Sequence, residues 1–273
     1  MNKVCVILYG ALANQIFMIF TCISKAIDEG KDFSIYPLYE NRYKFYFTSL
    51  LKSLVFKVET DLTYIKTTNG YEERGFEYYP IPKEANVIKG YFQSYKYFHH
   101  NKDKIIQKIG LDKFIEKYQL NYKAIAIHLR FGDYTYNQAN HYLLRPSYYV
   151  NALNKMIDLI PDIEDYKILI FTESNDDLLV DDFIEEFKKG VKKELNYNKF
   201  YELNKGLKDY EDMLYMSSCE HIIISNSTFS WFSAYLSRNK NKRIIYPDKW
   251  FGLSNSNNST KDLFFDDWIM VKS

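Results

Sequence analysis

The sequence has no long apolar run and no excess of charge of one sign. No stretch of its 273 residues approaches the roughly 20 apolar residues that a membrane-spanning helix needs. Lys3 precedes an apolar run of only about six residues, shorter than the roughly 7–15 of a secretory signal core. With 36 basic and 35 acidic residues the net charge is +1, so no basic field would recruit nucleic acid. We therefore expect a cytoplasmic protein that does not bind nucleic acid.

Cysteine is scarce, and several catalytic signatures are missing. Cys5, Cys22 and Cys219 lie in apolar settings and form no CxxC pair, which indicates buried thiols in a reducing compartment. The phosphate motif GxxxxGK[ST] and the dinucleotide motif GxGxxG are absent. GxSxG and HExxH are absent too, and no Asp-x-Asp triplet offers a metal clamp for a nucleoside diphosphate.

Apolar and aromatic residues are abundant. They make up 47 % and 18 % of the chain, enough for a large core and too many for a disordered protein. Short apolar runs alternate with patterns of helical period, which is typical of βαβ units and parallel sheets. We expect strands at residues 4–8, 33–36, 87–91, 124–129, 167–172, 200–202, 221–224 and 243–246. We expect helices at residues 14–29, 97–109, 146–160, 177–188, 209–218 and 228–238.

The chain divides near residues 111–122 into two halves of the same kind. Residues 40–86 show no sustained period, which predicts a variable segment of short helices. A second series of alternating strands and helices begins near residue 120. We therefore expect an α/β protein with two Rossmann-like domains, residues 1–115 and residues 116–273.

The most informative stretch is His-Leu-Arg-Phe-Gly-Asp-Tyr at 128–134, directly after the apolar run at 124–127. Open α/β sheets bind ligands at the carboxyl ends of their strands. Arg130 offers a fork of donors that suits a phosphate. Gly132 permits a tight turn, and Asp133 would take a proton or orient Arg130. The alternative is an ordinary ion pair between Arg130 and Asp133.

Three other loops follow predicted strands. Residues 225–229 lie between a strand and a helix, where backbone amides and the helix dipole make an anion site. An ordinary N-cap explains this loop equally well. The small residues at 10–15 would let the backbone approach a ligand, or simply form a turn with an Asn cap. The acids at 171–177 would hold a ribose or a base, or cap the next helix.

Read together, these motifs resemble glycosyltransferase family 11, the bacterial-type α-1,2-fucosyltransferases. HLRFGDY resembles the family's H-x-R-R-G-D-Y, and GALANQIF resembles G-G-L-G-N-Q-M-F. GYFQSYKYF at 90–98 is similar to G-Y-W-Q-S-x-K-Y-F, and FTESNDD at 171–177 resembles F-S-D-D. The longest match is MSSCEHIIISNSTFSWFSAYL at 216–236. The motifs occur in the family's order over almost the whole chain.

The resemblance implies a GT-B fold, in which two Rossmann-like domains face each other across a cleft. It implies that residues 116–273 bind GDP-fucose as the donor substrate and that residues 1–115 bind most of the acceptor. It further implies an inverting reaction with no cofactor and no metal, in agreement with the missing Asp-x-Asp.

The resemblance also assigns site residues. The catalytic residues would be Arg130, which stabilises charge on the departing pyrophosphate, and Asp133, as the base or as the partner that orients Arg130. The donor-binding residues would be His128, Arg130, Glu173, Asn226, Ser227, Thr228 and Phe229. The residues that face the cleft from the acceptor side would be Asn14, Gln15 and Gln93.

Three features depart from the family pattern. Phe131 replaces a second arginine, which would reduce donor affinity or turnover if that arginine holds phosphate. Ala11 and Ala13 replace glycines, so the first loop is less permissive. Glu173 stands where the family has a pair of acids after a serine.

The expected function is transfer of L-fucose from GDP-fucose to a galactose hydroxyl of a glycan, in the synthesis of surface polysaccharide or O-antigen. A lipid-linked acceptor would add at most peripheral contact with the inner membrane. One alternative is a glycosyltransferase that uses another nucleotide sugar. Another is a non-catalytic protein that binds a nucleotide sugar or a glycan.

Overall fold

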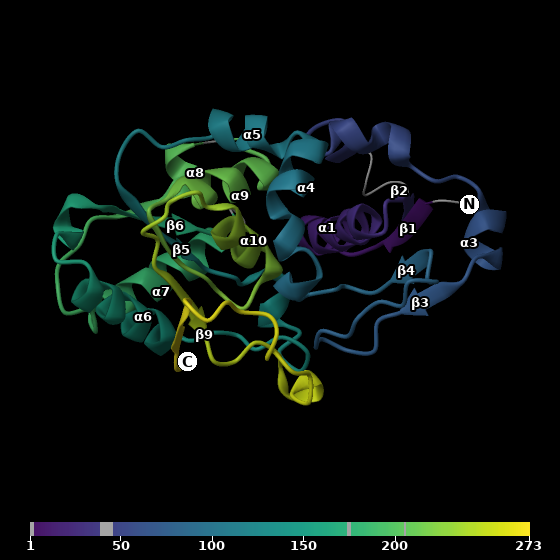
Figure 1. The fold of residues 1–273 in the computed structure, drawn as a ribbon. Helices are drawn as coiled ribbons and strands as arrows, with labels where there is room; N and C mark the ends of the chain where they lie inside the picture. The colour runs from purple at the N-terminus through teal and green to yellow at the C-terminus, as the bar shows by residue number, and fades with distance from the viewer. Residues whose placement is uncertain (1–2, 39–45, 174–175, 205) are drawn as a thin grey trace. The chain divides into compact units, whose positions relative to one another are not determined.

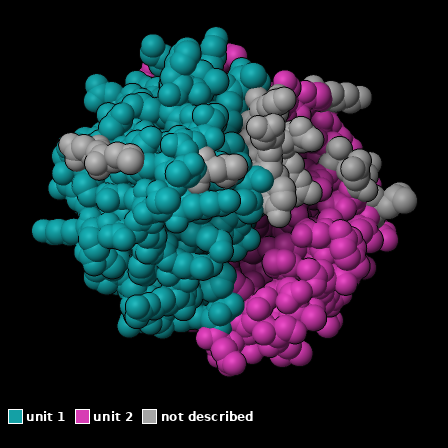
Figure 2. All heavy atoms as spheres, turned by 90° about the vertical axis from the view of Figure 1, so that its right-hand side faces the viewer, with its two compact units in different colours: residues 1–114, 258–265 teal, residues 115–257, 266–273 magenta. Residues whose placement is uncertain are grey.

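The chain forms two compact units in the computed structural model, which describes residues 3–38, 46–173, 176–204 and 206–273 (Figure 1). Unit 1 comprises residues 1–114 and 258–265, and unit 2 comprises residues 115–257 and 266–273, as coloured in Figure 2. Residues 40–45 of the predicted variable segment lie outside the described residues. So do Ser174 and Asn175 of the predicted acidic motif.

Unit 1 is built on a parallel sheet of four strands in the order β2-β1-β4-β3. The 17-residue helix α1 links β1 to β2 and buries almost every side chain of its first four turns. The strands are β1 (Lys3–Leu8), β2 (Asp32–Pro37), β3 (Gly70–Glu72) and β4 (Val87–Lys89). The helices are α1 (Leu12–Asp28), η1 (Lys52–Lys57), α3 (Leu62–Thr67), η2 (Tyr95–Tyr97), η3 (His99–Asn101) and α4 (Lys102–Ile109).

Two predictions for unit 1 are wrong in detail. β3 lies within residues 40–86, where only short helices are expected, because three residues with mixed polarity give no strand pattern. The helix expected at 97–109 is regular only from Lys102, since the chain first makes the two 3-10 turns η2 and η3. Its end is predicted correctly: α4 stops at Gly110, whose φ of +70° is the left-handed conformation that favours glycine.

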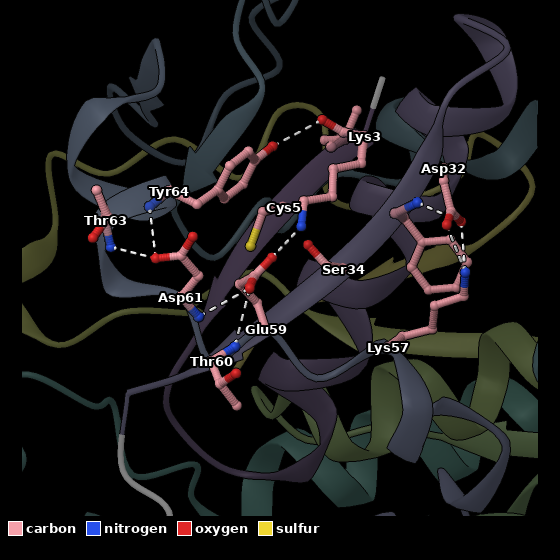
Figure 3. Close-up of polar contacts among 12 residues, drawn as sticks. Lys3, Cys5, Asp32, Ser34, Lys57, Glu59, Thr60, Asp61, Thr63 and Tyr64 are labelled. Atoms are coloured by element: carbon pink, nitrogen blue, oxygen red, sulfur yellow. Dashed lines mark hydrogen bonds and ion pairs between the residues drawn. The ribbon is translucent and has the colours of Figure 1, made fainter. Parts of the chain in front are cut away.

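A polar cluster secures the amino ends of β1 and β2 (Figure 3). Glu59 pairs with Lys3 and accepts hydrogen bonds from the backbone amides of Thr60 and Asp61 at 3.1 and 3.0 Å. The Tyr64 hydroxyl donates to the backbone carbonyl of Lys3 at 3.1 Å. These groups lie at the edge of the sheet opposite to the strands' carboxyl ends, so we assign them a structural role.

Unit 2 contains a parallel sheet of six strands in the order β10-β9-β8-β5-β6-β7. Helices cover both faces, with α6 and α7 on one side and α8, α9 and α10 on the other (Figure 1). The strands are β5 (Ala124–His128), β6 (Lys167–Phe171), β7 (Tyr197–Lys199), β8 (His221–Ile223), β9 (Ile244–Pro247) and β10 (Ile269–Val271). The α-helices are α5 (Leu111–Lys117), which begins in unit 1, α6 (Pro146–Leu159), α7 (Asp177–Lys188), α8 (Phe200–Leu203), α9 (Asp209–Ser218) and α10 (Thr228–Leu236). The 3-10 helices are η4 (Gly132–Thr135), η5 (Ile163–Asp165) and η7 (Leu253–Asn255).

The core of unit 2 explains which of its elements the pattern finds. All five residues of β5 are buried because the strand is central and covered on both faces, so it reads as an uninterrupted apolar run. The strand expected at residues 200–202 is wrong. Those residues form α8, in which Phe200 stacks on Phe171 at 4.4 Å between ring centres, and the strand β7 precedes them. The three-residue edge strand β10 is not predicted at all.

The three cysteines are buried and form no disulfide, as predicted. Burial raises the pKa of the Cys5 thiol to about 11, and it also raises the pKa of Cys22 and of Cys219. Across the described ranges, no helix combines the length and the apolar character that a membrane span requires.

Both sheets reverse their strand order beside their first strand. In unit 1 the chain runs from β1 to β2 and then returns to place β4 on the other side of β1. In unit 2 it runs outward from β5 through β6 and β7, and then returns to place β8 on the other side of β5. Such a reversal opens a crevice between the loops at the carboxyl ends of the two central strands, which is where doubly wound sheets bind ligands. These loops therefore form the candidate site.

Candidate active site

A hydrogen bond crosses the reversal point of unit 2. His128 is the last residue of β5, and Ser225 follows β8. The imidazole Nδ1 of His128 and the Ser225 hydroxyl are 2.7 Å apart. The Tyr149 hydroxyl donates to the backbone carbonyl of His128 at 3.2 Å, and the Phe229 ring lies 5.4 Å from the imidazole. His128 is thus fixed between the ends of β5 and β8, beside the residues that open α10.

The His128 imidazole is held uncharged. Burial lowers its pKa to about 3, and the positive charge of Arg130 acts in the same direction. At neutral pH the ring is therefore a hydrogen-bonding group and not a cation. Of His128 and Arg130, only Arg130 would therefore offer a positive charge to a pyrophosphate bound here.

We expect His128 to make the folded protein less stable as the pH falls. The unfolded chain gains a proton near the ordinary histidine pKa of 6.5, whereas folded His128 gains one only near 3. The free energy of unfolding should therefore fall by up to about 1.4 kcal/mol per pH unit below 6.5 from this group. Chemical denaturation between pH 7.5 and 5 should show this slope, and His128→Gln should reduce it.

The matched control is His100→Gln, which removes an exposed imidazole of unit 1. It should keep the slope that His128 causes. A His128→Gln variant whose unfolding free energy falls with pH as steeply as that of the wild type would contradict the assignment.

Arg130 is held between two carboxylates. Its guanidinium pairs with Asp133 at 2.5 Å and with Glu173, and it lies over the Tyr134 ring, 5.3 Å from the ring centre. Burial alone would lower the pKa of Arg130, but Glu173 and Asp133 outweigh it and hold the pKa above its ordinary value. The ion pair with Asp133 that the sequence offered as the alternative is thus present. The Arg130 side chain remains 28 % exposed.

Gly132 shapes the loop that carries Arg130. Its φ of +44° lies in the left-handed region, where a Cβ would be strained. Its backbone amide donates to the Asp176 carboxylate at 3.2 Å, so the loop after β5 is tied to the loop after β6. Burial raises the pKa of Asp176 despite that hydrogen bond. Asp176 therefore acts within the protein, and Glu173 is the acid of this loop that reaches Arg130.

The amino end of α10 lies beside His128. The Ser227 hydroxyl accepts a hydrogen bond from the Phe229 amide at 3.3 Å, which makes Ser227 the N-cap of the helix. Thr228 and Phe229 form the first turn, whose amides carry the positive end of the helix dipole. The N-cap expected as the alternative is therefore present at a position that also suits an anion.

Asn226 is buried and uses its side-chain amide within the protein. Its side-chain amide donates to the backbone carbonyls of Tyr142 and Trp250 at 2.7 and 2.9 Å. The backbone carbonyl of Asn226 accepts a hydrogen bond from the Tyr134 hydroxyl at 3.0 Å. The side-chain nitrogen of Asn226 thus joins two loops of unit 2. The predicted contact of Asn226 with the donor substrate would have to come from other atoms of the residue.

In unit 1 two of the three predicted acceptor-side residues form a hydrogen bond across the reversal point. The Gln93 side chain, after β4, donates to the Asn14 side chain, after β1, at 3.1 Å. Gln15 is different: it is 1 % exposed, and its amide donates to the backbone carbonyl of Gly10 at 3.0 Å. Asn14 and Gln93 are therefore brought together, and Gln15 supports the first loop from within.

Two polar residues at the unit 2 crevice are missing from the predicted set. Ser225 is the first hydroxyl after β8, and Tyr134 joins Arg130 to Asn226. Both lie inside the motifs singled out above, so their position after a strand is the signal that would have found them. In the ranges that the structure describes, no three His, Cys, Asp or Glu residues gather as a metal site.

Comparison with known proteins gives relatives that match somewhat more than half of this chain. The chain is 31 % identical over 154 residues to the O-antigen biosynthesis glycosyltransferase WbnK of Escherichia coli, and the match covers 55 % of this chain and 45 % of that protein. It is 28 % identical over 171 residues to an Escherichia coli alpha-1,2-colitosyltransferase, covering 59 % and 55 %. The chain thus spans about half the length of the curated relatives it matches.

Among solved structures, the fucosyltransferase NodZ from Bradyrhizobium aligns with a TM-score of 0.48 and 12 % identity, covering 91 % of this chain and 96 % of that one. The Escherichia coli ADP-heptose lps heptosyltransferase II gives the same TM-score with 11 % identity, covering 98 % and 90 %. Scores below 0.5 carry no argument about this chain.

The sequence match is more specific. Because the model of glycosyl transferase family 11 matches residues 65–272, most of the chain and all the motifs of unit 2, the protein belongs to that family.

Proposed function

We propose that the protein is a galactoside α-1,2-fucosyltransferase that moves L-fucose from GDP-fucose to a galactose hydroxyl of a glycan acceptor. The observation that carries the proposal is the position of Arg130 and the amino end of α10 at the reversal point of the unit 2 sheet. A nucleoside diphosphate needs cationic and amide donors at such a crevice. Family membership and the names of the two relatives support the same class of reaction.

The reaction would be an in-line displacement at the anomeric carbon of fucose. The acceptor oxygen forms a bond to that carbon as the bond to the GDP oxygen breaks, and the configuration inverts. Negative charge then grows on the β-phosphate of GDP. Arg130 and the positive end of the α10 dipole at Thr228 would stabilise that charge as fixed groups. No cofactor and no metal enters this proposal.

Asp133 has two possible roles in this step. As a base it would take the proton that the acceptor hydroxyl loses, and as a partner it would orient Arg130. Its contact with the Arg130 guanidinium at 2.5 Å supports the orienting role. The proton would then leave to the departing GDP or to water. We propose orientation of Arg130 as the main task of both Asp133 and Glu173.

The acceptor is proposed to bind unit 1. Asn14 and Gln93 offer side-chain amides at the reversal point of its sheet, where a sugar hydroxyl would find both donors and acceptors. GDP-fucose and a galactose-containing glycan are the proposed partners. A lipid-linked glycan in O-antigen synthesis would bring the protein to the surface of the inner membrane without a membrane span.

A second donor is supported by one specific observation. One of the relatives is named an alpha-1,2-colitosyltransferase, and colitose is fucose without its 3-hydroxyl. The linkage and the nucleotide would stay the same, so only the contact with one sugar hydroxyl would differ. Transfer of a colitosyl group is therefore the alternative that deserves a direct comparison.

A panel of nucleotide sugars would decide between these readings. Purified protein is incubated with GDP-fucose, GDP-colitose, GDP-mannose or UDP-galactose and a set of β-galactosides, and the products are identified by mass spectrometry. We expect a fucosyl adduct and free GDP in equal amounts, also in the presence of EDTA. A colitosyl adduct alone would favour the second donor, and calorimetric GDP binding without any transfer would favour a non-catalytic protein.

A further inference from the structure

Unit 1 contains a strained turn directly after β4. Gly90 has a φ of +156°, and Phe92 has a φ of +51°, the only positive φ at a non-glycine residue in the described part of the chain. Phe92 is fully buried, and its ring packs edge-on to Tyr97 at 5.3 Å. A side chain holds this left-handed conformation only where its surroundings impose it. The turn is therefore kept in place by contacts with its neighbours.

Glu73 is that group. It follows β3, the neighbour of β4, and its carboxylate accepts a hydrogen bond from the backbone amide of Phe92 at 2.9 Å. Its own amide donates to the carbonyl of Lys89, the last residue of β4, at 2.8 Å. A Cβ placed on Gly90 would lie 2.3 Å from the Glu73 Cβ, so glycine is required there. Glu73 thus packs against the turn and pairs with its strained amide.

The turn places two side chains against the loop after β1. The Tyr91 ring lies 4.8 Å from the Tyr9 ring, centre to centre. Gln93, the next residue but one, makes the hydrogen bond to Asn14 that crosses the reversal point of the sheet. The positions of both side chains follow from the backbone of residues 90–92. Any change that releases the turn would therefore move the face of unit 1 to which the acceptor is assigned.

We propose that Glu73 is a positioning residue for the acceptor: it holds the Gly90–Phe92 turn and, through it, presents Tyr91 and Gln93 beside Asn14. The role in acceptor binding rests on the proposed function, whereas the hold on the turn does not. The Glu73 carboxyl does not touch the acceptor, since one of its oxygens is used by Phe92 and the other is buried.

The chemistry of this carboxyl suggests the test. Burial raises the pKa of Glu73 to about 7, against the amides of Phe92 and Tyr91, which favour the ionised form. The uncharged carboxyl is therefore well populated near neutral pH, and glutamine is a close mimic that still offers an oxygen to Phe92. Alanine removes the oxygen that accepts the hydrogen bond from the Phe92 amide. Glu72→Gln is the matched control, because Glu72 is an exposed neighbour that pairs with Lys89.

The first measurement is amide hydrogen exchange of the intact protein, followed by mass spectrometry. In Glu73→Ala we expect the amides of residues 91–94 to exchange about tenfold faster or more, because a hydrogen bond to a carboxyl and its packing are lost. Glu73→Gln should stay near the wild type, and Glu72→Gln should not differ from it. Wild-type exchange at 91–94 in Glu73→Ala, or an equal rise across all of unit 1, would overturn the proposal. If Glu73→Ala does not fold, Glu73→Asp is used, and the same faster exchange is expected because its shorter carboxyl cannot reach Phe92.

The second measurement separates positioning from chemistry. With GDP-fucose and the best β-galactoside of the panel, Glu73→Ala should raise the KM of the acceptor several-fold and leave the KM of GDP-fucose unchanged, and Glu73→Gln should restore the acceptor KM. An unchanged acceptor KM, or equal changes in both KM values, would refute the role in acceptor binding. Because hydrogen exchange needs neither substrate nor transfer, failure of the proposed function would leave the first test intact.

Discussion

Replacing Arg130 by alanine should abolish most of the transfer activity and leave the fold in place. Removal of one fixed donor to a developing negative charge typically lowers kcat by about 10²–10³. Arg130 carries the positive charge of the loop after β5, and the neighbouring His128 is uncharged, so that ring cannot replace it. The loss should appear mainly in kcat, because the charge on GDP grows in the transition state.

The stability of this variant should change little. The partners of Arg130 are the Asp133 and Glu173 side chains, which are 43 % and 55 % exposed. Water can therefore solvate both carboxylates once the guanidinium is gone, and exposed ion pairs contribute only about 0–1 kcal/mol. Thermal unfolding and circular dichroism of Arg130→Ala should stay close to the wild type. This separates a loss of chemistry from a loss of structure.

Two further variants sharpen the result. Arg130→Lys keeps the charge but loses the planar fork, so its kcat should lie between those of the wild type and Arg130→Ala. Arg238→Ala removes an exposed arginine just beyond the carboxyl end of α10, where it pairs with Glu116, and should transfer at the wild-type rate. Turnover of Arg130→Ala at the wild-type rate would remove Arg130 from the mechanism.

The sequence predicts the architecture where burial imposes a period. β5 and β6 are apolar runs because they lie in the middle of a covered sheet, and α1 shows its apolar face because it packs on β1. The sequence does not predict β3 and β10, because strands of three residues at the edge of a sheet need no such pattern. Residues 200–202 are wrongly predicted as a strand because aromatic residues are common in strands. In the structure Phe200 belongs to the helix α8 and stacks on Phe171.

The sequence also predicts which loops form the candidate site, since strands that alternate with helices put their carboxyl ends on one edge. It does not predict where an amide side chain points. Gln15 and Asn226 carry groups that suit a ligand as well as a backbone carbonyl, and in the structure their amides bind carbonyls. Glu73 escapes notice for another reason: its role depends on the backbone conformation of Phe92, which no pattern of residue types reveals.

The inward turn of Asn226 leads to the second large effect: Asn226→Asp should destabilise unit 2 by about 3–5 kcal/mol, the cost of leaving a buried charge unpaired. The Asn226 side chain is almost completely buried and donates to the carbonyls of Tyr142 and Trp250. Aspartate has nearly the same shape, but its ionised carboxylate would face two carbonyl oxygens with no proton to donate. Chemical denaturation at pH 7 would measure the loss.

The pH dependence of this variant identifies the cause. Repulsion from the two carbonyls and burial would raise the pKa of the new carboxyl in the folded state above its unfolded value of about 3.9. The folded state then binds the proton more tightly, so part of the lost stability should return as the pH falls through that raised pKa. His128 acts in the opposite direction, so the comparison is made with the wild type at each pH.

Asn151→Asp provides the matched control, because Asn151 is exposed on α6 in the same unit. It makes the same chemical change where water can solvate the carboxylate, and its stability should stay within about 0.5 kcal/mol of the wild type. A loss in Asn226→Asp no larger than in this control would mean that the two hydrogen bonds do not hold the loops together. A large loss that does not recover at low pH would point to packing and not to charge. The expected combination, a large loss with partial recovery, requires that the Asn226 amide donates both hydrogen bonds, which gives this asparagine of the candidate anion site a structural role.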